Sequence, residues 1–456
     1  MSARAPSKQF NLTSTDFGTG FSWGISTAAY QNEGAHNIDG KGPSIWDTFT
    51  QKKGTIYKAQ NGQTACDFFH RYKADILLLK EMNIPNFRFS LAWSRLLPKG
   101  YGHISPQGVD FYNRVIDFCL ECGIRPWITL YHWDLPQALE DHGGWMNRDI
   151  LGWFEDYVKL CASLFGDRVT HWMVLNEPMV FTGAGYFLGV HAPGKKGLKS
   201  FLPAVHHATL CQAIGGKVVR GLVPNAEVGT TFSCSQINAF SEKSKDIRAA
   251  QKADVLLNRL FIEPALGLGY PSEDLPILKR LDSFKKEGDD QKLLFDFDFI
   301  GIQNYTREVV KHSYTVPYLH AKIVPATDRP VKTTLMDWEV HPPSIYNMIA
   351  KFNAYSNIPK IIVTENGAAF SDNIRNGAVH DPERLGYLQQ YLYQVHKAQQ
   401  DGYKVSGYFA WTFTDNFEWA EGYFPRFGLV YTDFPSQRRI IKSSGKWYRD
   451  FLGNVP

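Results

Sequence analysis

Long hydrophobic runs are missing from this sequence. No stretch reaches the about 18 consecutive apolar residues that a membrane-spanning helix needs. The opening stretch MSARAPSKQFNLTSTDF also contains no apolar segment of the about 7 to 15 residues that a secretory signal requires. We therefore expect a cytoplasmic protein that does not insert into a membrane.

An excess of charge of one sign is missing as well. The chain has 49 Lys and Arg residues against 45 Asp and Glu residues, a formal net charge of +4 over 456 residues. Such a dispersed charge provides no basic surface, so we expect neither a nucleic acid nor an anionic membrane as a partner. The hydrophobic share of 44% and the charged share of 21% are typical of a globular protein.

Patterns for metals, disulfides and nucleotides are scarce. The chain has six cysteines, and its one C-x-x-C pair, Cys119 and Cys122, lies in DFCLECGI, which is typical of a helix end. No two histidines have H-x-x-H or H-E-x-x-H spacing, which argues against a metal site. The glycine-rich stretch GTGFSWG, residues 18–24, precedes a strand, whereas a dinucleotide-binding turn follows one. We expect reduced thiols, no metal and no nucleotide cofactor.

Eight short β-branched and aromatic segments alternate with longer helical patterns. The expected strands lie in FSWGIST (21–27), NFRFSLAW (86–93), RPWITLYHW (125–133), HWMVLNE (171–177), AEVGTTFS (226–233), DFIGIQNY (298–305), KIIVTEN (360–366) and VSGYFAWTF (405–413). Between them, residues 107–123 and 381–402 place apolar residues at three- and four-residue spacing and end on glycine, as amphipathic helices do. This alternation predicts an α/β protein, a single (β/α)8 TIM barrel over residues 1–456; a doubly wound sheet is the alternative.

Polar side chains gather where these strands end. In a (β/α)8 barrel the carboxyl ends of the strands form the active-site face. Each of these polar residues alone has a structural explanation. Polar residues at the ends of six strands are nevertheless hard to assign to chance. The residues concerned are Gln31, His132-Trp133-Asp134, Asn176-Glu177, Gln303-Asn304-Tyr305, Glu365-Asn366, and Trp411 with Glu418-Trp419.

Two of these residues, Glu177 and Glu365, are carboxylates at the ends of apolar strands. They stand 188 residues apart in the sequence, yet in a closed barrel both would face the same opening. Two carboxyl groups that flank a bond, surrounded by hydrogen-bonding side chains and Trp rings, are what glycoside hydrolysis needs. The pattern therefore favours a glycosidase.

Several longer motifs resemble those of glycoside hydrolase family 1, the retaining β-glucosidases and β-galactosidases. The motifs run in order from residue 21 to about residue 430 and read FSWGISTAAYQNEGA, GPSIWD, RFSLAW, LYHWDLP, LNEP, VTENG and EWAEGYFPRFGL. The resemblance implies a (β/α)8 barrel, no cofactor, and exo-cleavage of β-linked glucosides or short oligosaccharides. It also implies a double-displacement mechanism that retains the configuration of the sugar.

The resemblance assigns roles to individual residues. It implies that Glu365 in TENG is the nucleophile, with Arg88 and Tyr305 beside it, and that Glu177 in NEP is the acid/base. It implies a leaving-group platform at Trp338. The residues that it implies for binding the sugar are Gln31, His132, Trp133, Asn176, Trp411, Glu418 and Trp419. At one position this chain differs, because Gln303 occupies the place where most members of the family carry Asn.

Three other functions within reach of this resemblance are a 6-phospho-β-glucosidase, a thioglucosidase and an inactive sugar-binding barrel. Phospho-sugar enzymes typically lack the Glu at position 418, because a carboxylate about 4 Å from a phosphate costs roughly 4 kcal/mol per unit charge at an effective dielectric of 20. Thioglucosidases typically replace the acid/base with Gln, and inactive relatives usually lose one carboxylate. Glu418, Glu177 and Glu365 are all present, which favours hydrolysis of unphosphorylated glucosides, together with galactosides and fucosides.

Overall fold

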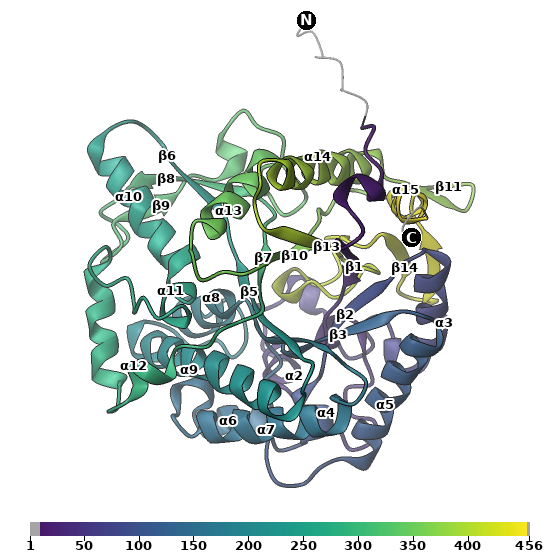
Figure 1. Ribbon diagram of the computed structural model, residues 1–456, viewed down its shortest axis with the longest axis horizontal. Helices are drawn as coiled ribbons and strands as arrows, with labels where there is room; N and C mark the ends of the chain where they lie inside the picture. Colours follow the sequence, from purple (N-terminus) through teal and green to yellow (C-terminus); the bar gives the residue numbers. More distant parts are fainter. Residues whose placement is uncertain (1–9, 454–456) are drawn as a thin grey trace, which may run out of the picture.

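The structure is a computed structural model that describes residues 10–453. A closed barrel of eight parallel strands occupies its centre, and helices surround it (Figure 1). Around the barrel the strand order is β1-β13-β10-β7-β5-β4-β3-β2. The strands are β1 (Ser22–Ser26), β2 (Asn86–Ser90), β3 (Arg125–Tyr131), β4 (His171–Asn176), β5 (Glu227–Ser233), β7 (Phe299–Gln303), β10 (Ile361–Asn366) and β13 (Val405–Trp411). All eight expected strands are confirmed, and the closed barrel rules out the doubly wound alternative.

Nearly every strand residue is buried. In β3, six of the seven residues are buried, and all residues of β2, β4, β7 and β10 are buried. Continuous burial explains why these segments read as apolar runs rather than as an alternation of polar and apolar residues, because helices cover the outside of the barrel and side chains fill the inside.

A layer of large side chains fills the barrel interior. It consists of Trp127, Met173, Phe299, Ile362 and Phe409, which come from five different strands and are all at most 1% exposed. The Trp127 ring lies 4.8 Å from the Phe409 ring and 5.8 Å from the Phe299 ring, measured between centroids. This layer makes the barrel a packed core rather than a pore, so a ligand must bind at one end.

Long helices cover the outside of the barrel. They are α3 (Phe68–Glu81), α5 (Pro106–Glu121), α7 (Ile150–Phe165), α9 (Leu198–Leu222), α13 (Pro343–Asn353), α14 (Pro382–Gln400) and α15 (Ser443–Leu452). Helix α5 begins where the Ser105 hydroxyl group accepts a hydrogen bond from the Gly108 amide at 3.1 Å, and Gly123, just beyond its end, has a φ of +76°. An N-cap serine and a left-handed glycine are ordinary helix boundaries. The observed ranges of α5 and α14 confirm the two expected helices to within a few residues.

Shorter elements occupy the connections between strands and helices. The α-helices in these connections are α1 (Ala29–Asn32), α2 (Ile45–Phe49), α4 (Trp93–Leu96), α6 (Gln137–Asp141), α8 (Pro178–Thr182), α10 (Ser244–Asp254), α11 (Ile262–Ala265) and α12 (Asp289–Lys292). The 3₁₀ segments are Ser14–Phe17, Tyr57–Ala59, Gly144–Met146, Pro276–Phe284, Ala326–Asp328 and Trp419–Glu421, and the π-helical segments are Gly183–Leu188 and Val255–Arg259.

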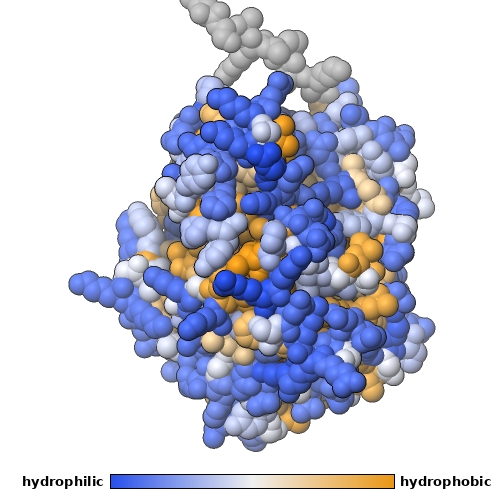
Figure 2. Space-filling model, turned by 90° about the vertical axis from the view of Figure 1, so that its left-hand side faces the viewer, coloured by the Kyte–Doolittle hydropathy of each residue, from blue (hydrophilic) through white to orange (hydrophobic). Residues whose placement is uncertain are grey.

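Among residues 10–453, three small sheets lie outside the barrel. The first contains β6 (Gln236–Ala239), β8 (Arg307–His312) and β9 (Ala321–Ile323), which pack against α10. The second contains β11 (Asn373–Arg375) and β12 (Ala378–His380), and the third β14 (Val430–Asp433) and β15 (Arg438–Ile441). The β6-β8-β9 sheet lies at the left of Figure 1. Figure 2 turns that side toward the reader and shows a mostly hydrophilic face, with hydrophobic side chains gathered near its middle.

The state of the cysteines and the length of the helices can be compared with the expectations from the sequence. All six cysteines are free thiols, and five of them are buried. Cys119 and Cys122 lie at the end of α5, as expected from DFCLECGI. Within residues 10–453, no helix is long and apolar enough to cross a membrane.

Candidate active site

A cleft of about 360 Å³ opens at the carboxyl ends of the barrel strands. Its volume is within the usual range for small-molecule sites. Nine of the thirteen candidate residues line it: His132, Trp133, Glu177, Tyr305, Trp338, Glu365, Trp411, Glu418 and Trp419. The other four, Gln31, Arg88, Asn176 and Gln303, are buried and hydrogen-bond to one another or to the lining residues. Residues from most of the chain therefore meet at one place.

Glu365 lies near the end of β10 and is held by two donors. The Arg88 guanidinium donates through Nη1 to Oε1 at 2.5 Å, and the Tyr305 hydroxyl group donates to Oε2 at 2.7 Å. Glu365 is 3% exposed and Arg88 is fully buried. A cation and a hydrogen bond to the charged form both favour an ionised carboxylate.

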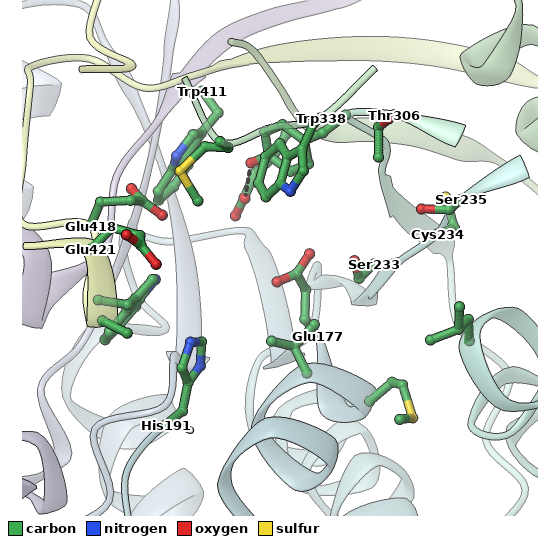
Figure 3. A pocket seen from close by; sticks show the side chains of 18 of the residues that line it. Glu177, His191, Ser233, Cys234, Ser235, Thr306, Trp338, Trp411, Glu418 and Glu421 are labelled. Carbon is green, nitrogen blue, oxygen red and sulfur yellow. Dashed lines mark hydrogen bonds between the residues drawn. The ribbon is translucent and has the colours of Figure 1, made fainter. Parts of the chain in front are cut away.

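Glu177 follows β4 directly and precedes Pro178, the first residue of α8. Its backbone has a φ of +47°, in the left-handed region that non-glycine residues rarely adopt. Trp133 and Trp419, which also line the cleft, have φ values of +75° and +49°. Strained backbone of this kind clusters at functional sites. Figure 3 shows the Glu177 side chain pointing into the cleft.

The two carboxyl groups differ in their affinity for a proton. Burial and the neighbouring Glu365 carboxylate raise the pKa of Glu177 well above its ordinary value. Burial also raises the pKa of Glu365, but Arg88 and Tyr305 act in the opposite direction on that group. A single proton shared by the pair therefore resides on Glu177, and Glu365 carries the charge.

Asn176 connects the charged centre to His132. Its Oδ1 accepts hydrogen bonds from Arg88 Nη2 at 2.5 Å, Gln303 Nε2 at 2.8 Å and Thr231 Oγ1 at 3.0 Å. Its Nδ2 lies 3.0 Å from His132 Nε2. Because its oxygen is fully occupied, the part of Asn176 that remains available to a ligand is the amide nitrogen. Gln303 reaches this oxygen with its longer side chain and does not line the cleft.

His132 is neutral and presents a donor. Burial and the Arg88 charge lower its pKa well below the ordinary value. In a neutral imidazole the nitrogen that accepts the Asn176 amide hydrogen carries no proton, so Nδ1 carries it. The buried Nδ1 atom has no hydrogen-bond partner within the described residues, and an unmet buried donor is unusual unless a ligand or water completes it.

Glu418 lies on the side of the cleft away from Ser233 and Ser235 (Figure 3) and forms a second polar pair with Gln31. Gln31 donates through Nε2 to Glu418 Oε2 at 3.2 Å, and Gln31 Oε1 has no partner among residues 10–453. Burial raises the pKa of Glu418 to about 8, and the Glu365 charge adds to that shift. The rings of Trp411, Trp419 and Trp133 also line the cleft and are largely buried.

Three polar residues expected at this face turn away from it. Asp134 is buried beside Lys41, Glu33 and Asp47 in a separate small cavity. Asn304 hydrogen-bonds to the backbone of the β5 and β7 connections, and Asn366 to the Tyr387 and Tyr408 hydroxyl groups. These side chains support the strand ends without lining the cleft.

Several residues that line the cleft did not stand out in the sequence, among them Ser233, Glu421 and Glu308. The Ser233 hydroxyl group lies beside Glu177 and opposes the rise of its pKa, and its place at the end of β5 was an available signal. Glu421 lies beside Glu418 (Figure 3). Glu308 belongs to the small β6-β8-β9 sheet, and no sequence pattern places it near the barrel opening.

Comparisons with known proteins agree with this geometry. The family model described as "Glycosyl hydrolase family 1" matches residues 13–455. "Beta-glucosidase A" from Thermotoga maritima is 41% identical over 440 residues, which cover 96% of this chain and 98% of that protein. "Beta-glucosidase A" from Acetivibrio thermocellus is 41% identical over 450 residues, covering 97% and 99% of the two chains.

Solved structures of family 1 β-glucosidases are also similar to this chain over nearly its whole length. A family 1 β-glucosidase from Thermotoga maritima superposes with a TM-score of 0.92 at 40% identity, covering 96% of this chain and 98% of that chain. Another structure of the Thermotoga maritima enzyme, with the same TM-score, identity and coverage, is a complex with glucoimidazole. The AHE enzyme from Alicyclobacillus herbarius has a TM-score of 0.93 at 37% identity, covering 96% and 97% of the two chains.

Proposed function

The chain belongs to glycosyl hydrolase family 1, and from this premise we propose that it is an exo-acting, retaining β-glucosidase. The observation that carries the proposal is the pair of buried carboxyl groups in one cleft, of which Glu177 holds a proton more strongly than Glu365. The full-length similarity to proteins named β-glucosidase supports the same substrate class. We further propose that residues 1–456 act as one catalytic domain.

In the proposed first step, Glu365 attacks the anomeric carbon of a β-glucoside. The bond from that carbon to the leaving-group oxygen breaks, and Glu177 transfers its proton to this oxygen as the alcohol departs. A covalent glycosyl ester on Glu365 remains. Arg88 and Tyr305 position the attacking carboxylate and keep it ionised until it reacts.

In the proposed second step, water cleaves the ester. Esterification removes the negative charge of Glu365, which is one of the two main causes of the raised pKa of Glu177. Glu177 therefore becomes a better base, takes a proton from water, and directs the hydroxide to the anomeric carbon. Two inversions give net retention. This mechanism requires carboxyl groups about 5 to 5.5 Å apart, which we expect for Glu177 and Glu365.

The proposed sugar subsite lies between the catalytic pair and Glu418. The unpartnered His132 Nδ1 donor and Gln31 Oε1 acceptor fit hydroxyl groups of the sugar. The amide hydrogen of Asn176 that is not bound to His132 fits a third. Glu418 and the Trp133 and Trp419 rings complete this subsite. Trp411 would form its floor, because an aromatic face suits the apolar side of a sugar ring.

The proposed leaving-group platform is Trp338. It lies next to the Tyr305 ring, with 5.3 Å between the ring centroids, and is partly exposed to the cleft. Figure 3 shows Trp338 above Glu177, on the side of the cleft where the leaving group must depart if Glu177 protonates it. A substrate would therefore span from Glu418 to Trp338.

We propose unphosphorylated sugars as substrates, with β-galactosides and β-fucosides as further candidates. Glu177, Glu308, Glu365, Glu418 and Glu421 line the cleft, whereas no lysine or arginine of residues 10–453 does so. A phosphate group on the sugar would meet Glu418 and find no cation to pair with, and burying an unpaired charge is costly.

A panel of 4-nitrophenyl β-glycosides tests this proposal. We expect hydrolysis of the glucoside, galactoside and fucoside, and a kcat/KM for glucoside 6-phosphate at least about tenfold lower than for the glucoside. A higher kcat/KM for the 6-phosphate would replace the proposal with a phospho-glucosidase. Binding of glucose without hydrolysis of any glycoside would indicate an inactive sugar-binding barrel.

A further inference from the structure

The outer wall of the cleft comes from the connections that follow β5 and β7. Ser235 follows β5, Leu257 lies in the π-helical segment Val255–Arg259, Glu308 lies on β8 and Ile323 on β9. Figure 3 places Ser235 and Thr306 on the opposite side of Glu177 from Glu418 and Glu421. This wall therefore faces the leaving group rather than the sugar, if the substrate lies as proposed.

Most of this wall is apolar or carries only hydroxyl groups. Among the described residues of this wall, Glu308 is the one with a carboxyl group. Leu257 and Ile323 contribute aliphatic side chains to the same wall. A charged group in such surroundings is costly unless it has a partner.

Within the part of the chain that the structure describes, Glu308 has no such partner. Its carboxyl group makes no hydrogen bond and no ion pair to any residue between 10 and 453. Arg329 is the cation that lowers the pKa of Glu308, but its guanidinium group is bound to Glu339. Glu339 also binds Arg307. The two guanidinium groups near this wall are thus already engaged by a different carboxylate.

The carboxyl group is nevertheless only partly accessible. Burial raises the pKa of Glu308 to about 7, with Arg329 opposing the rise and Glu339 adding to it. A carboxyl group that is half-buried, unpartnered and directed at a cleft is a site for a ligand group, because a structural carboxylate is normally paired, as Glu339 is.

We propose that Glu308 is a specificity-determining residue that binds a hydrogen-bond donor on the leaving group, prefers a cationic amine there, and rejects a carboxylate. This inference rests on the proposed function, because it assigns the leaving group to the outer wall. The leaving group that fits has an apolar or sugar-ring body, which packs on Trp338, Met336 and Leu257, and a hydroxyl or ammonium group that reaches Glu308.

The other charged residues of the cleft also favour a cationic leaving group over an anionic one. The lining contains five glutamates and no lysine or arginine among the described residues. An ammonium group on the leaving group would be attracted by Glu308 at short range, and a carboxylate would be repelled. Repulsion of the wrong ligand contributes to specificity as much as attraction of the right one.

Two aryl glucosides that differ in charge test the proposal. They carry 4-(aminomethyl)phenyl and 4-(carboxymethyl)phenyl leaving groups, and kcat/KM is measured for both at about pH 8, where Glu308 is mostly ionised. We expect the wild type to prefer the cationic substrate. Glu308→Gln should reduce the ratio of the two kcat/KM values about tenfold, a modest value for a partly exposed charge. It should leave 4-nitrophenyl glucoside hydrolysis within about twofold of the wild type, because that leaving group has no donor for Glu308.

Glu121→Gln is the matched control, because Glu121 is exposed at the end of α5 and does not line the cleft. It removes the same net charge and should leave the ratio unchanged. An unchanged ratio in Glu308→Gln would overturn the proposal. Equal losses on all three substrates would also overturn it, since they would indicate a structural role.

A binding measurement separates this inference from the proposed function. The two charged leaving groups are attached to glucose through sulfur, and calorimetry gives their Kd values for the wild type and Glu308→Gln. If the wild type hydrolyses no glucoside, the proposed function fails, and the Kd ratio still decides the role of Glu308. A Kd ratio that does not change between the two proteins would contradict the inference by itself.

Discussion

Removing the Tyr305 hydroxyl group is expected to move the acidic limb of the pH–rate profile to higher pH. This hydroxyl group donates to Glu365 at 2.7 Å, and Glu365 is 3% exposed. Burial and the Glu365 charge raise the pKa of Tyr305 well above its ordinary value, so it remains a donor throughout the working pH range. The hydrogen bond favours the charged form of Glu365 and lowers its pKa.

The magnitude follows from the strength of such bonds. A hydrogen bond to a charged group contributes about 1.5–3 kcal/mol, and one pKa unit corresponds to about 1.4 kcal/mol. Tyr305→Phe should therefore raise the pKa of Glu365 by about one to two units. Because the nucleophile must be ionised, activity should disappear at a correspondingly higher pH as the pH falls.

The assay is kcat/KM for 4-nitrophenyl β-glucoside as a function of pH, since this ratio reports the ionisations of the free enzyme. Tyr346→Phe is the control, because Tyr346 donates to Asp401 at the same 2.7 Å distance on an exposed surface away from the cleft. Its profile should match the wild type. An acidic limb that does not move in Tyr305→Phe, or that moves to lower pH, would refute the assignment of Glu365 as the ionised partner.

Three further predictions concern single substitutions. Glu177→Ala should reduce kcat/KM for cellobiose by at least about a hundredfold, because a poor leaving group needs a proton in the transition state. An activated aryl glucoside does not need this proton and should still release its phenol in a burst. Equal losses of activity on both substrates would contradict the role of Glu177 as the acid. Glu418→Gln should narrow the difference in kcat/KM between glucoside and glucoside 6-phosphate, because a neutral amide repels phosphate less; an unchanged difference would show that Glu418 does not select the substrate. Lys442→Met should lower the free energy of unfolding, measured in denaturant titrations, by about 3–5 kcal/mol. The reason is that Lys442 contacts both Asp372 and Asp415, and the substitution leaves these buried carboxylates without that cation. A change in the free energy of unfolding below about 0.5 kcal/mol would show that the Lys442 charge is dispensable.

The barrel could be predicted from the sequence because each of its strands is buried on both sides. Continuous apolar runs such as those of β4 and β10 have no exposed positions to interrupt the pattern. The β6-β8-β9 sheet could not be predicted in the same way. All four residues of β6 and four of the six in β8 are only partly buried, so their sequences carry neither an apolar run nor a regular alternation.

The site could be predicted in outline but not in its details. Strand ends indicate which residues stand near the opening, and this was sufficient for Glu177 and Glu365. It was insufficient for Asp134, because the left-handed backbone of Trp133 interrupts the alternation of side chains that a strand would continue. His132 and Trp133 thus line the cleft, and Asp134 does not. Glu308 reaches the cleft only through tertiary packing of a separate sheet.

The central claim, that Glu365 is the nucleophile of a retaining mechanism, is tested most directly by labelling with 2-deoxy-2-fluoro-β-glucosyl fluoride. The 2-fluorine destabilises both transition states, and the good leaving group lets the first step proceed, so the glycosyl ester should accumulate. Mass spectrometry of a protease digest should then find the label on Glu365, and the unmutated enzyme should release the β-anomer of the sugar first. A label on any other residue, or the α-anomer as the first product, would contradict the account.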